Sequence, residues 1–247
     1  MTLKMSIKPR ILLLFGALLL ASCNSAPGNV SAVAKDSSVA SSIFPKAQRP
    51  VSAIVSDRWA SEAERDSVDE ANKVMDISGV NAGMSVADIG AGEGYYTIRL
   101  AARVGKEGRV LGQEIFPKVR EKLAERALRE RLDNVSVKLG APADPKLPEN
   151  SFDRIFMIHM YHEIEAPYEF LWRMRPALLP GGQVIVVDAN RPTGAHGIPP
   201  KQLMCEMNAV GFEMIDQHPL PSEGIFLMRF KVSGARPAPE AIKACGG

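Results

Sequence analysis

Apolar and polar positions alternate in two different periods over residues 57–232, and these periods predict strands and helices in turn. Apolar runs of roughly four to eight residues predict buried strands, whereas apolar side chains about three or four residues apart predict helices packed on one face. Because strands and helices alternate, we expect an α/β fold with a parallel sheet covered by helices on both faces. The expected strands are 86–89, 109–115, 135–139, 153–160, 183–188, 213–216 and 225–232, and the expected helices lie within 57–78 and at 95–104, 117–132, 167–178 and 200–210.

The stretch from Val86 to Tyr96 joins the first buried strand to a helix through a glycine-rich turn. Glycines let a ligand approach the main chain closely, and the N-terminus of the following helix favours an anionic group. A dinucleotide-binding fingerprint, G-x-G-x-x-G, would require glycine at position 95, where Tyr95 stands. The pattern is instead Asp-x-Gly-x-Gly-x-Gly and starts at Asp88. Its glycines are Gly90, Gly92 and Gly94.

This motif resembles the first motif of the class I S-adenosylmethionine-dependent methyltransferases, and the resemblance covers about residues 80–232. It implies a Rossmann-like seven-stranded sheet of order 3-2-1-4-5-7-6 with helices on both faces, and S-adenosylmethionine as the cofactor. Family relatives often place a leading helix over the cofactor, and residues 57–78 form either that helix or a solvated helix at the sheet edge. In the family the glycine loop holds the methionine part of the cofactor. The residues implied to do so here are Asp88, Gly90, Ala91, Gly92, Gly94 and Tyr95.

Two acidic residues complete the expected cofactor site. Glu114 ends the second strand about twenty residues after the glycines, where a carboxylate can accept hydrogen bonds from both ribose hydroxyls. Family members contact adenine after the third strand, and many have an acid directly after the glycine of that loop. Ala141 stands there in this chain, after Gly140. Asp144 either binds the adenine amino group or caps the turn.

The corner after the fourth strand carries Tyr161, His162 and Glu163, at the place where methyl acceptors bind in relatives. This Tyr-His-Glu sequence resembles a subgroup of bacterial methyltransferases that carry signal peptides. Histidine is the usual base near neutral pH, so we expect His162 to be catalytic as a general base. Glu163 would orient its ring or bind the acceptor, and Tyr161 would form a wall over the methyl group. In the alternative interpretation, His162 only holds the following loop through hydrogen bonds to the backbone.

The sequence gives less support for a metal site or for a serine nucleophile. His159 falls within the expected fourth strand and is interpreted as a core or rim residue. Together with His162, Glu163 and His196 it has the ligand types of a metal site, but the spacing fixes no geometry, and we expect no metal. No Gly-x-Ser-x-Gly motif of a serine nucleophile occurs.

The charge balance and the absent motifs narrow the partner. Lys4, Lys8 and Arg10 lie in an N-terminal segment that we expect to be removed. Without them the chain carries 27 basic and 28 acidic residues, so no basic field points to nucleic acid. The Asn/Asp-Pro-Pro-Tyr and Pro-Cys motifs of nucleic-acid methyltransferases are also absent. We therefore expect a small-molecule methyl acceptor, or an envelope component, and no nucleic acid.

The N-terminus has the pattern of a secretory signal. Three basic residues precede the apolar run 11–21, which is shorter than the roughly 20 residues that span a bilayer. The sequence Leu20-Ala21-Ser22-Cys23 resembles the bacterial lipobox, which implies a signal peptide at 1–22, lipidation of Cys23 and a membrane anchor on the periplasmic side. Asn24 rather than Asp follows the cysteine, so we expect the outer membrane. The alternative is an ordinary signal peptide with an incidental cysteine.

These features predict four segments: the signal peptide, a flexible tether at 23–50, a methyltransferase domain at 51–232 and a C-terminal tail at 233–247. Cys205 and Cys245 either form a disulfide, which an oxidising compartment permits, or remain free thiols. S-adenosylmethionine is charged and made in the cytosol, so it should not cross a bilayer unaided to reach a domain outside the cytosol. This leaves an alternative function open. In that alternative the chain is a methyltransferase-like lipoprotein that binds a small ligand without methyl transfer.

Overall fold

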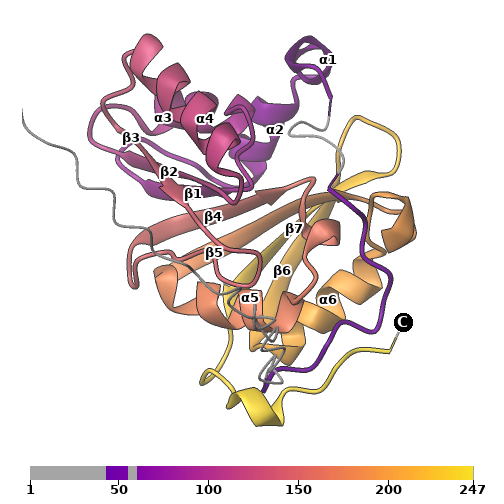
Figure 1. Cartoon of the computed structure of the whole chain (residues 1–247). Helices are drawn as coiled ribbons and strands as arrows, with labels where there is room; N and C mark the ends of the chain where they lie inside the picture. The colour runs from indigo at the N-terminus through magenta and orange to yellow at the C-terminus, as the bar shows by residue number, and fades with distance from the viewer. Residues whose placement is uncertain (1–42, 55–59, 247) are drawn as a thin grey trace, which may run out of the picture. The chain divides into compact units, whose positions relative to one another are not determined.

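The computed structural model describes residues 43–54 and 60–246, and its centre is one seven-stranded sheet (Figure 1). The strand order is β3-β2-β1-β4-β5-β7-β6, which confirms the predicted Rossmann-like methyltransferase topology. Neighbouring strands from β3 to β5 are parallel, and β7 is antiparallel to both β5 and β6. The strands are β1 (Ser85–Ile89), β2 (Arg109–Glu114), β3 (Val135–Leu139), β4 (Phe152–Ile158), β5 (Leu178–Ala189), β6 (Phe212–Pro219) and β7 (Ile225–Val232).

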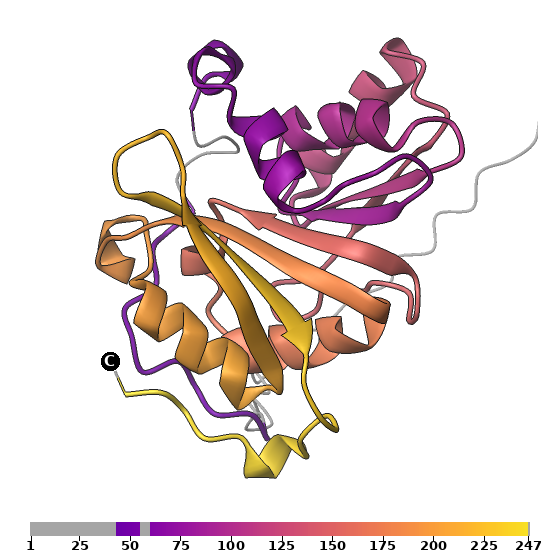
Figure 2. The same cartoon turned by 180° about the vertical axis from the view of Figure 1, so that it is seen from behind.

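Helices cover both faces of the sheet, as Figures 1 and 2 show. Leu100 of α3 and Val74 of α2 are fully buried in the core on one face, and Leu171 of α5 and Met207 of α6 in the core on the other. Within the described residues, no helix has both the length and the apolar character needed to cross a membrane. The helices are α1 (Glu62–Ser67), α2 (Glu70–Ile77), α3 (Tyr95–Val104), α4 (Pro117–Arg129), α5 (Pro167–Met174) and α6 (Pro200–Ala209).

Several boundaries differ from the predicted ones for local reasons. β4 ends at Ile158 because His159 takes a left-handed conformation with φ 55°, which a strand does not accommodate. The stretch 179–182, which separates the predicted helix 167–178 from the predicted strand 183–188, lies within β5, although the pairing of β5 with β4 shifts register there. The helix predicted at 167–178 is shorter, because Pro176 cannot continue it: α5 ends at Met174 and a 3₁₀ turn follows.

Residues 43–54, here called the N-terminal strap, pack against the domain although 43–50 were predicted as the end of a flexible tether. Figures 1 and 2 show the strap in indigo beside α6. Phe44 is buried with its ring centroid 5.4 Å from that of Trp172, and the Arg49 side chain is only 2% exposed. The strap therefore belongs to the folded unit. The predicted signal peptide, Cys23 and most of the predicted tether lie outside the described residues.

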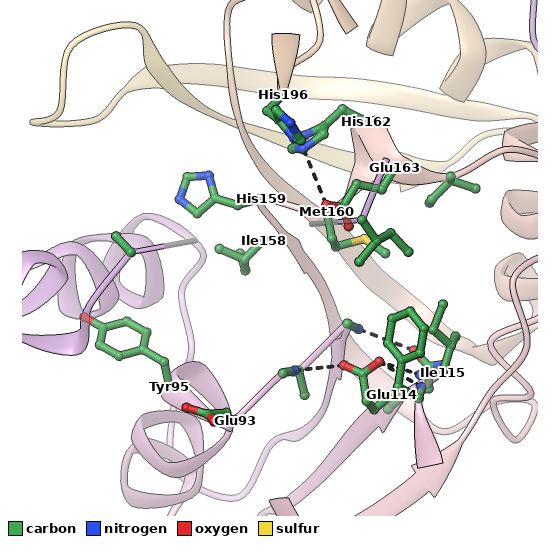
Figure 3. Close-up of a pocket in the computed structure, with 18 of the residues that line it drawn as sticks. Glu93, Tyr95, Glu114, Ile115, Ile158, His159, Met160, His162, Glu163 and His196 are labelled. Carbon is green, nitrogen blue, oxygen red and sulfur yellow. Dashed lines mark hydrogen bonds and ion pairs between the residues drawn. The ribbon is translucent and has the colours of Figure 1, made fainter. Parts of the chain in front are cut away.

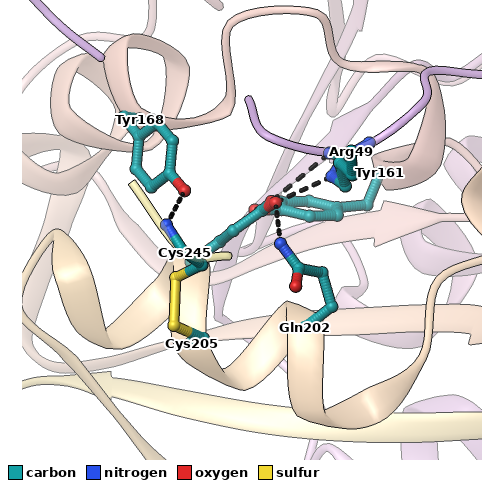
Figure 4. Close-up of a disulfide and its surroundings, with 7 residues drawn as sticks. Arg49, Tyr161, Tyr168, Gln202, Cys205 and Cys245 are labelled. Carbon is teal, nitrogen blue, oxygen red and sulfur yellow. Dashed lines mark hydrogen bonds and ion pairs between the residues drawn. A yellow bond between two sulfur atoms is a disulfide. The ribbon is translucent and has the colours of Figure 1, made fainter. Parts of the chain in front are cut away.

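The segment that follows β7 is also packed (Figure 4). Cys205 of α6 and Cys245 form a disulfide, one of the two alternatives that the sequence left open. The backbone N–H of Cys245 donates to the hydroxyl of Tyr168 at 2.7 Å, and Trp172 donates to the carbonyl of Pro237 at 2.8 Å. Residues 233–246 thus fold back onto α5 and α6.

Candidate functional site

A cavity of about 850 Å³ lies at the carboxyl ends of β1, β2 and β4 (Figure 3). The loop after β1, residues 113–116 at the end of β2, and residues 158–160 and 162–165 at the end of β4 and after it line it. Small-molecule sites in proteins typically have volumes of about 300–1,000 Å³. Ligands of open α/β sheets bind at this edge, where the strand order reverses, so this cavity is the candidate site.

The glycine loop brings bare main chain to the cavity wall. Gly90 and Gly92 have φ angles of +66° and +55°, and both line the cavity together with Ala91. A Cβ at Gly90 would lie 3.1 Å from Cγ of Met160, so a larger residue there would press on the corner after β4. These three residues stand where the sequence predicted them.

Asp88 and Gly94 have different roles from those predicted, since neither lines the cavity. Asp88 is buried beneath the loop, where it accepts a hydrogen bond from the Thr97 hydroxyl at 2.6 Å. Burial raises the pKa of Asp88 to about 6. Gly94 precedes α3, and a Cβ there would come 2.5 Å from Cδ1 of Leu123. Both residues support the loop from behind.

Glu114 joins the glycine loop to the end of β2. Its Oε2 accepts from the N–H of Gly92 at 3.0 Å, and its Oε1 accepts from Ile115 at 2.6 Å and Phe116 at 3.2 Å. A carboxylate has about four acceptor sites, so three backbone donors leave about one for a ribose hydroxyl. The predicted acceptance of both hydroxyls would require one backbone donor to be released.

The leading helix α1 borders the cavity through Glu62 and Arg65, which is one of the two positions that the sequence left open for residues 57–78. Tyr95 lines the cavity, and the Arg65 guanidinium lies 3.9 Å from the centroid of its ring. The Tyr95 hydroxyl donates to Asp66 at 2.9 Å, and Arg65 pairs with Glu70 at 2.7 Å. These contacts hold α1 over the start of α3.

Asp144 caps its turn, which was one of its two predicted roles. Its Oδ1 accepts from the N–H of Lys146 at 2.7 Å, and residues 141 and 144 form an isolated β-bridge. Pro142 of the same turn lines the cavity, whereas Asp144 does not. The adenine-binding role predicted for Asp144 therefore has no support in the geometry.

His162 is held by a partner that the sequence analysis missed. Its ring is buried, and its Nδ1 lies 2.8 and 3.0 Å from the two carboxylate oxygens of Asp188, at the end of β5. Because a carboxylate only accepts hydrogen bonds, this contact places the proton on Nδ1 and leaves the lone pair on Nε2. Nε2 lies 4.0 Å from Oε1 of Glu163. The sequence did contain a signal for this contact, because Asp188 is an acid at the end of the strand that lies beside β4.

Glu163 and His196 stand beside His162 at the cavity wall (Figure 3). Burial raises the pKa of Glu163 to about 7. The rings of His162 and His196 meet edge to face with centroids 5.8 Å apart. Among the described residues, one ligand atom each of His162, Glu163 and His196 lie within 4.8 Å of one another. His159 also lines the cavity, but its Nε2 faces Glu70 at 3.5 Å, and burial lowers its pKa.

The prediction that Tyr161 forms a wall of the site is wrong. Its side chain is fully buried, does not line the cavity and donates its hydroxyl to Oε2 of Glu206 at 2.8 Å (Figure 4). Glu206 also accepts from Arg49 of the strap at 2.7 Å. Arg49 lies within 3.4 Å of the carbonyl oxygen of His162, to which it donates. Tyr161 and Arg49 therefore brace the corner from the side away from the cavity.

Comparison with known proteins matches this chain to methyltransferases. A model of the methyltransferase domain family matches residues 80–219, more than half of the chain. A ubiquinone/menaquinone biosynthesis C-methyltransferase of Idiomarina loihiensis is 30% identical over 125 residues, which are 49% of each chain. A nocamycin O-methyltransferase of Saccharothrix syringae is 42% identical over 84 residues, 34% of this chain and 30% of that one. The chain thus spans about half or less of the length of these curated relatives.

Solved structures share the fold. An S-adenosylmethionine-dependent methyltransferase from Aquifex aeolicus superposes with a TM-score of 0.63 at 21% identity, over 70% of this chain and 98% of that one. S-adenosylmethionine is the cofactor of this class, and the cavity fits it: the loop from Gly90 to Gly92 exposes main chain, and Glu114 retains an acceptor site. The chain belongs to the methyltransferase domain family and has the Rossmann-like fold of its S-adenosylmethionine-dependent members.

Proposed function

We propose that this protein methylates a small molecule, or an envelope component, that binds at the corner formed by His162 and Glu163. One observation carries the proposal: a single cavity contains both the glycine loop with Glu114 and the His162 corner. When bound, S-adenosylmethionine supplies a methyl group that is already activated on a sulfonium. The remaining tasks of the protein are to orient the acceptor, exclude water and take up a proton.

The corner is suited to those tasks. Asp188 holds the His162 ring so that Nε2 lies beside Glu163, where it can take a proton from an acceptor hydroxyl, thiol or protonated amine. Glu163 is half-buried beside it and can bind or orient the same acceptor. The relatives named above methylate carbon in one case and oxygen in the other, so their names leave the acceptor atom open.

Replacing His162 by alanine is expected to lower turnover by about a hundredfold or more, because it removes the base. The measurement is formation of S-adenosylhomocysteine with a panel of small phenols, quinols, thiols and amines. Affinity for S-adenosylmethionine should be nearly unchanged, since His162 stands on the acceptor side. His218→Ala changes a partly exposed histidine on β6 that does not line the cavity, so it is the matched control and should keep full turnover.

Alanine also leaves the buried Asp188 without its partner, so a second variant separates catalysis from folding. The side-chain amide of His162→Asn can still donate to Asp188 but has no counterpart of Nε2. It should keep the thermal midpoint of the wild type and lose turnover as alanine does. Full turnover in a stable His162→Asn protein would refute the base and leave the loop-holding role.

We also propose that Cys23 anchors the protein by lipid to the periplasmic side of a bacterial membrane, on the basis of the Leu20-Ala21-Ser22-Cys23 motif. A single acyl chain binds only marginally, and stable attachment needs more than one. A fatty-acid probe supplied to growing cells should label the wild type, and Cys23→Ser should abolish the label and release the protein from the membrane fraction. Equal labelling of both would contradict the anchor.

A further inference from the structure

We propose that His162, Glu163 and His196 bind a divalent transition-metal ion at the acceptor side of the cavity. Their ligand atoms lie within 4.8 Å of one another although His196 is separated from the other two by the whole of β5. Two imidazoles and one carboxylate form the ligand set of several catalytic zinc sites, which keep a further position open. Metal bonds of about 2.0–2.1 Å need ligand atoms roughly 3.3 Å apart, so the side chains must close by an ångström or so.

His162 already has the orientation of a metal-binding histidine. Metal-bound imidazoles almost always donate their other ring N–H to a carboxylate or carbonyl, which fixes the tautomer and makes the free nitrogen more basic. Asp188 accepts from Nδ1 of His162 at 2.8 Å and is itself fully buried. The other nitrogen, Nε2, is the one that faces Glu163.

The N-terminal strap holds the backbones of both histidines. The N–H of Ser52 donates to the carbonyl of His162 at 3.3 Å, and Oγ of Ser52 accepts from the N–H of His196 at 3.1 Å. His196 has a left-handed φ of 55°, an uncommon conformation that other parts of a structure must hold in place. A Cβ at Gly197 would lie 2.5 Å from the carbonyl oxygen of Ala189, so this loop packs tightly on the end of β5. Two separate loops are thus fixed relative to each other at the proposed site.

The remaining freedom lies in the side chains that must close on the ion. Glu163 and His196 are partly exposed at the cavity wall, whereas the His162 ring is buried and fixed. Nitrogen-rich ligand sets suit zinc and neighbouring transition metals, while magnesium and calcium prefer oxygen alone. Three protein ligands leave an open position toward the cavity for an oxygen, nitrogen or sulfur atom of the acceptor.

The role of the ion, but not its binding, rests on the proposed function. A metal-bound acceptor atom has a lowered pKa, so the ion would activate the acceptor when it is present. In the ion-free protein Nε2 of His162 would take the proton directly. Metal binding and methyl transfer are therefore separate measurements.

The test uses Zn²⁺ as the probe. Purified protein, stripped with a chelator, should bind one equivalent of Zn²⁺ by calorimetry and by elemental analysis after dialysis. His196→Ala and Glu163→Gln should each weaken binding by about a hundredfold or more, and Asp188→Asn by about ten- to a hundredfold, as for outer-shell partners. His218→Ala is the matched control and should bind like the wild type. Cys205 and Cys245 do not compete because they form a disulfide.

Absence of stoichiometric Zn²⁺ in the wild type would overturn the proposal, and so would binding that His196→Ala and Glu163→Gln both leave unchanged. His196 and Glu163 are the deciding positions because they are partly exposed, so that loss of binding can be compared at an unchanged thermal midpoint. Titration of the same preparations with S-adenosylmethionine separates the two proposals. Bound Zn²⁺ without cofactor binding would support the metal site and refute the proposed methyl transfer, and the reverse result would do the opposite.

Discussion

Glu114→Ala is expected to lower the affinity for S-adenosylmethionine by about a hundredfold or more. The variant removes one carboxylate acceptor site for the ribose and the three backbone hydrogen bonds that hold the glycine loop and the end of β2. Hydrogen bonds to a charged group contribute roughly 1.5–3 kcal/mol each. Loss of the one ribose bond lowers the affinity by about ten- to a hundredfold, since every 1.4 kcal/mol is a factor of ten, and release of the glycine loop adds to this loss. Calorimetric titration with S-adenosylmethionine measures the change.

Two further variants define the cause of that loss. Glu114→Gln keeps the shape and one acceptor oxygen but loses the charge, so its affinity should lie between those of wild type and Glu114→Ala. Glu125→Ala changes an exposed glutamate on α4 and is the matched control. Unchanged affinity in Glu114→Ala would mean that the cofactor lies elsewhere, and binding of a nicotinamide dinucleotide instead would mean that the glycine spacing had been misinterpreted.

The sequence predicted the sheet well because the features that determine it are local. Each buried strand is a short apolar run, and each helix has its own apolar face, as with Leu100 and Val104 of α3. The order of the strands followed from the resemblance around Asp88 and not from these patterns. The predicted ends of elements were wrong where the backbone conformation of a single residue decides them, as at His159, because a periodic pattern does not encode φ.

The candidate site was predicted by segment better than by residue. Residues 161–163 form a 3₁₀ turn, in which successive side chains point about 120° apart. Glu163 therefore reaches the cavity while Tyr161 points into the core, and the letters Tyr-His-Glu alone do not show which does which. Asp188 was missed because its pairing with His162 depends on two neighbouring strands ending at the same level.

The strap was missed for a related reason. Residues 23–50 are rich in Ser, Ala and Pro, which is the composition of a linker. Arg49, however, pairs with Glu206 across 157 positions of sequence. A buried ion pair of this kind holds a segment with the composition of a linker on the domain, and the composition alone does not reveal it.

Arg49→Ala is therefore expected to destabilise the protein by about 3–5 kcal/mol, the effect of removing one partner from a buried ion pair. Both side chains are almost fully buried, with Nε of Arg49 2.7 Å from Oε1 of Glu206. Among the residues that the structure describes, the variant leaves Glu206 with the Tyr161 hydroxyl and the Gln202 amide as side-chain donors, which do not neutralise its charge. For a chain of this size the thermal midpoint should fall by roughly 6–20 °C.

The double variant Arg49→Met, Glu206→Gln tests whether the buried charge is the cause. It removes both charges and lets Tyr161 still donate to the amide oxygen, so it should be more stable than Arg49→Ala. Arg103→Ala, which breaks a surface pair with Asp76, is the matched control and should change the stability by less than about 1 kcal/mol. A midpoint for Arg49→Ala equal to that of the wild type would show that the strap is detached in solution. Because Arg49 also donates to the carbonyls of His162 and Ile164, detachment would leave the corner that carries His162 without this brace.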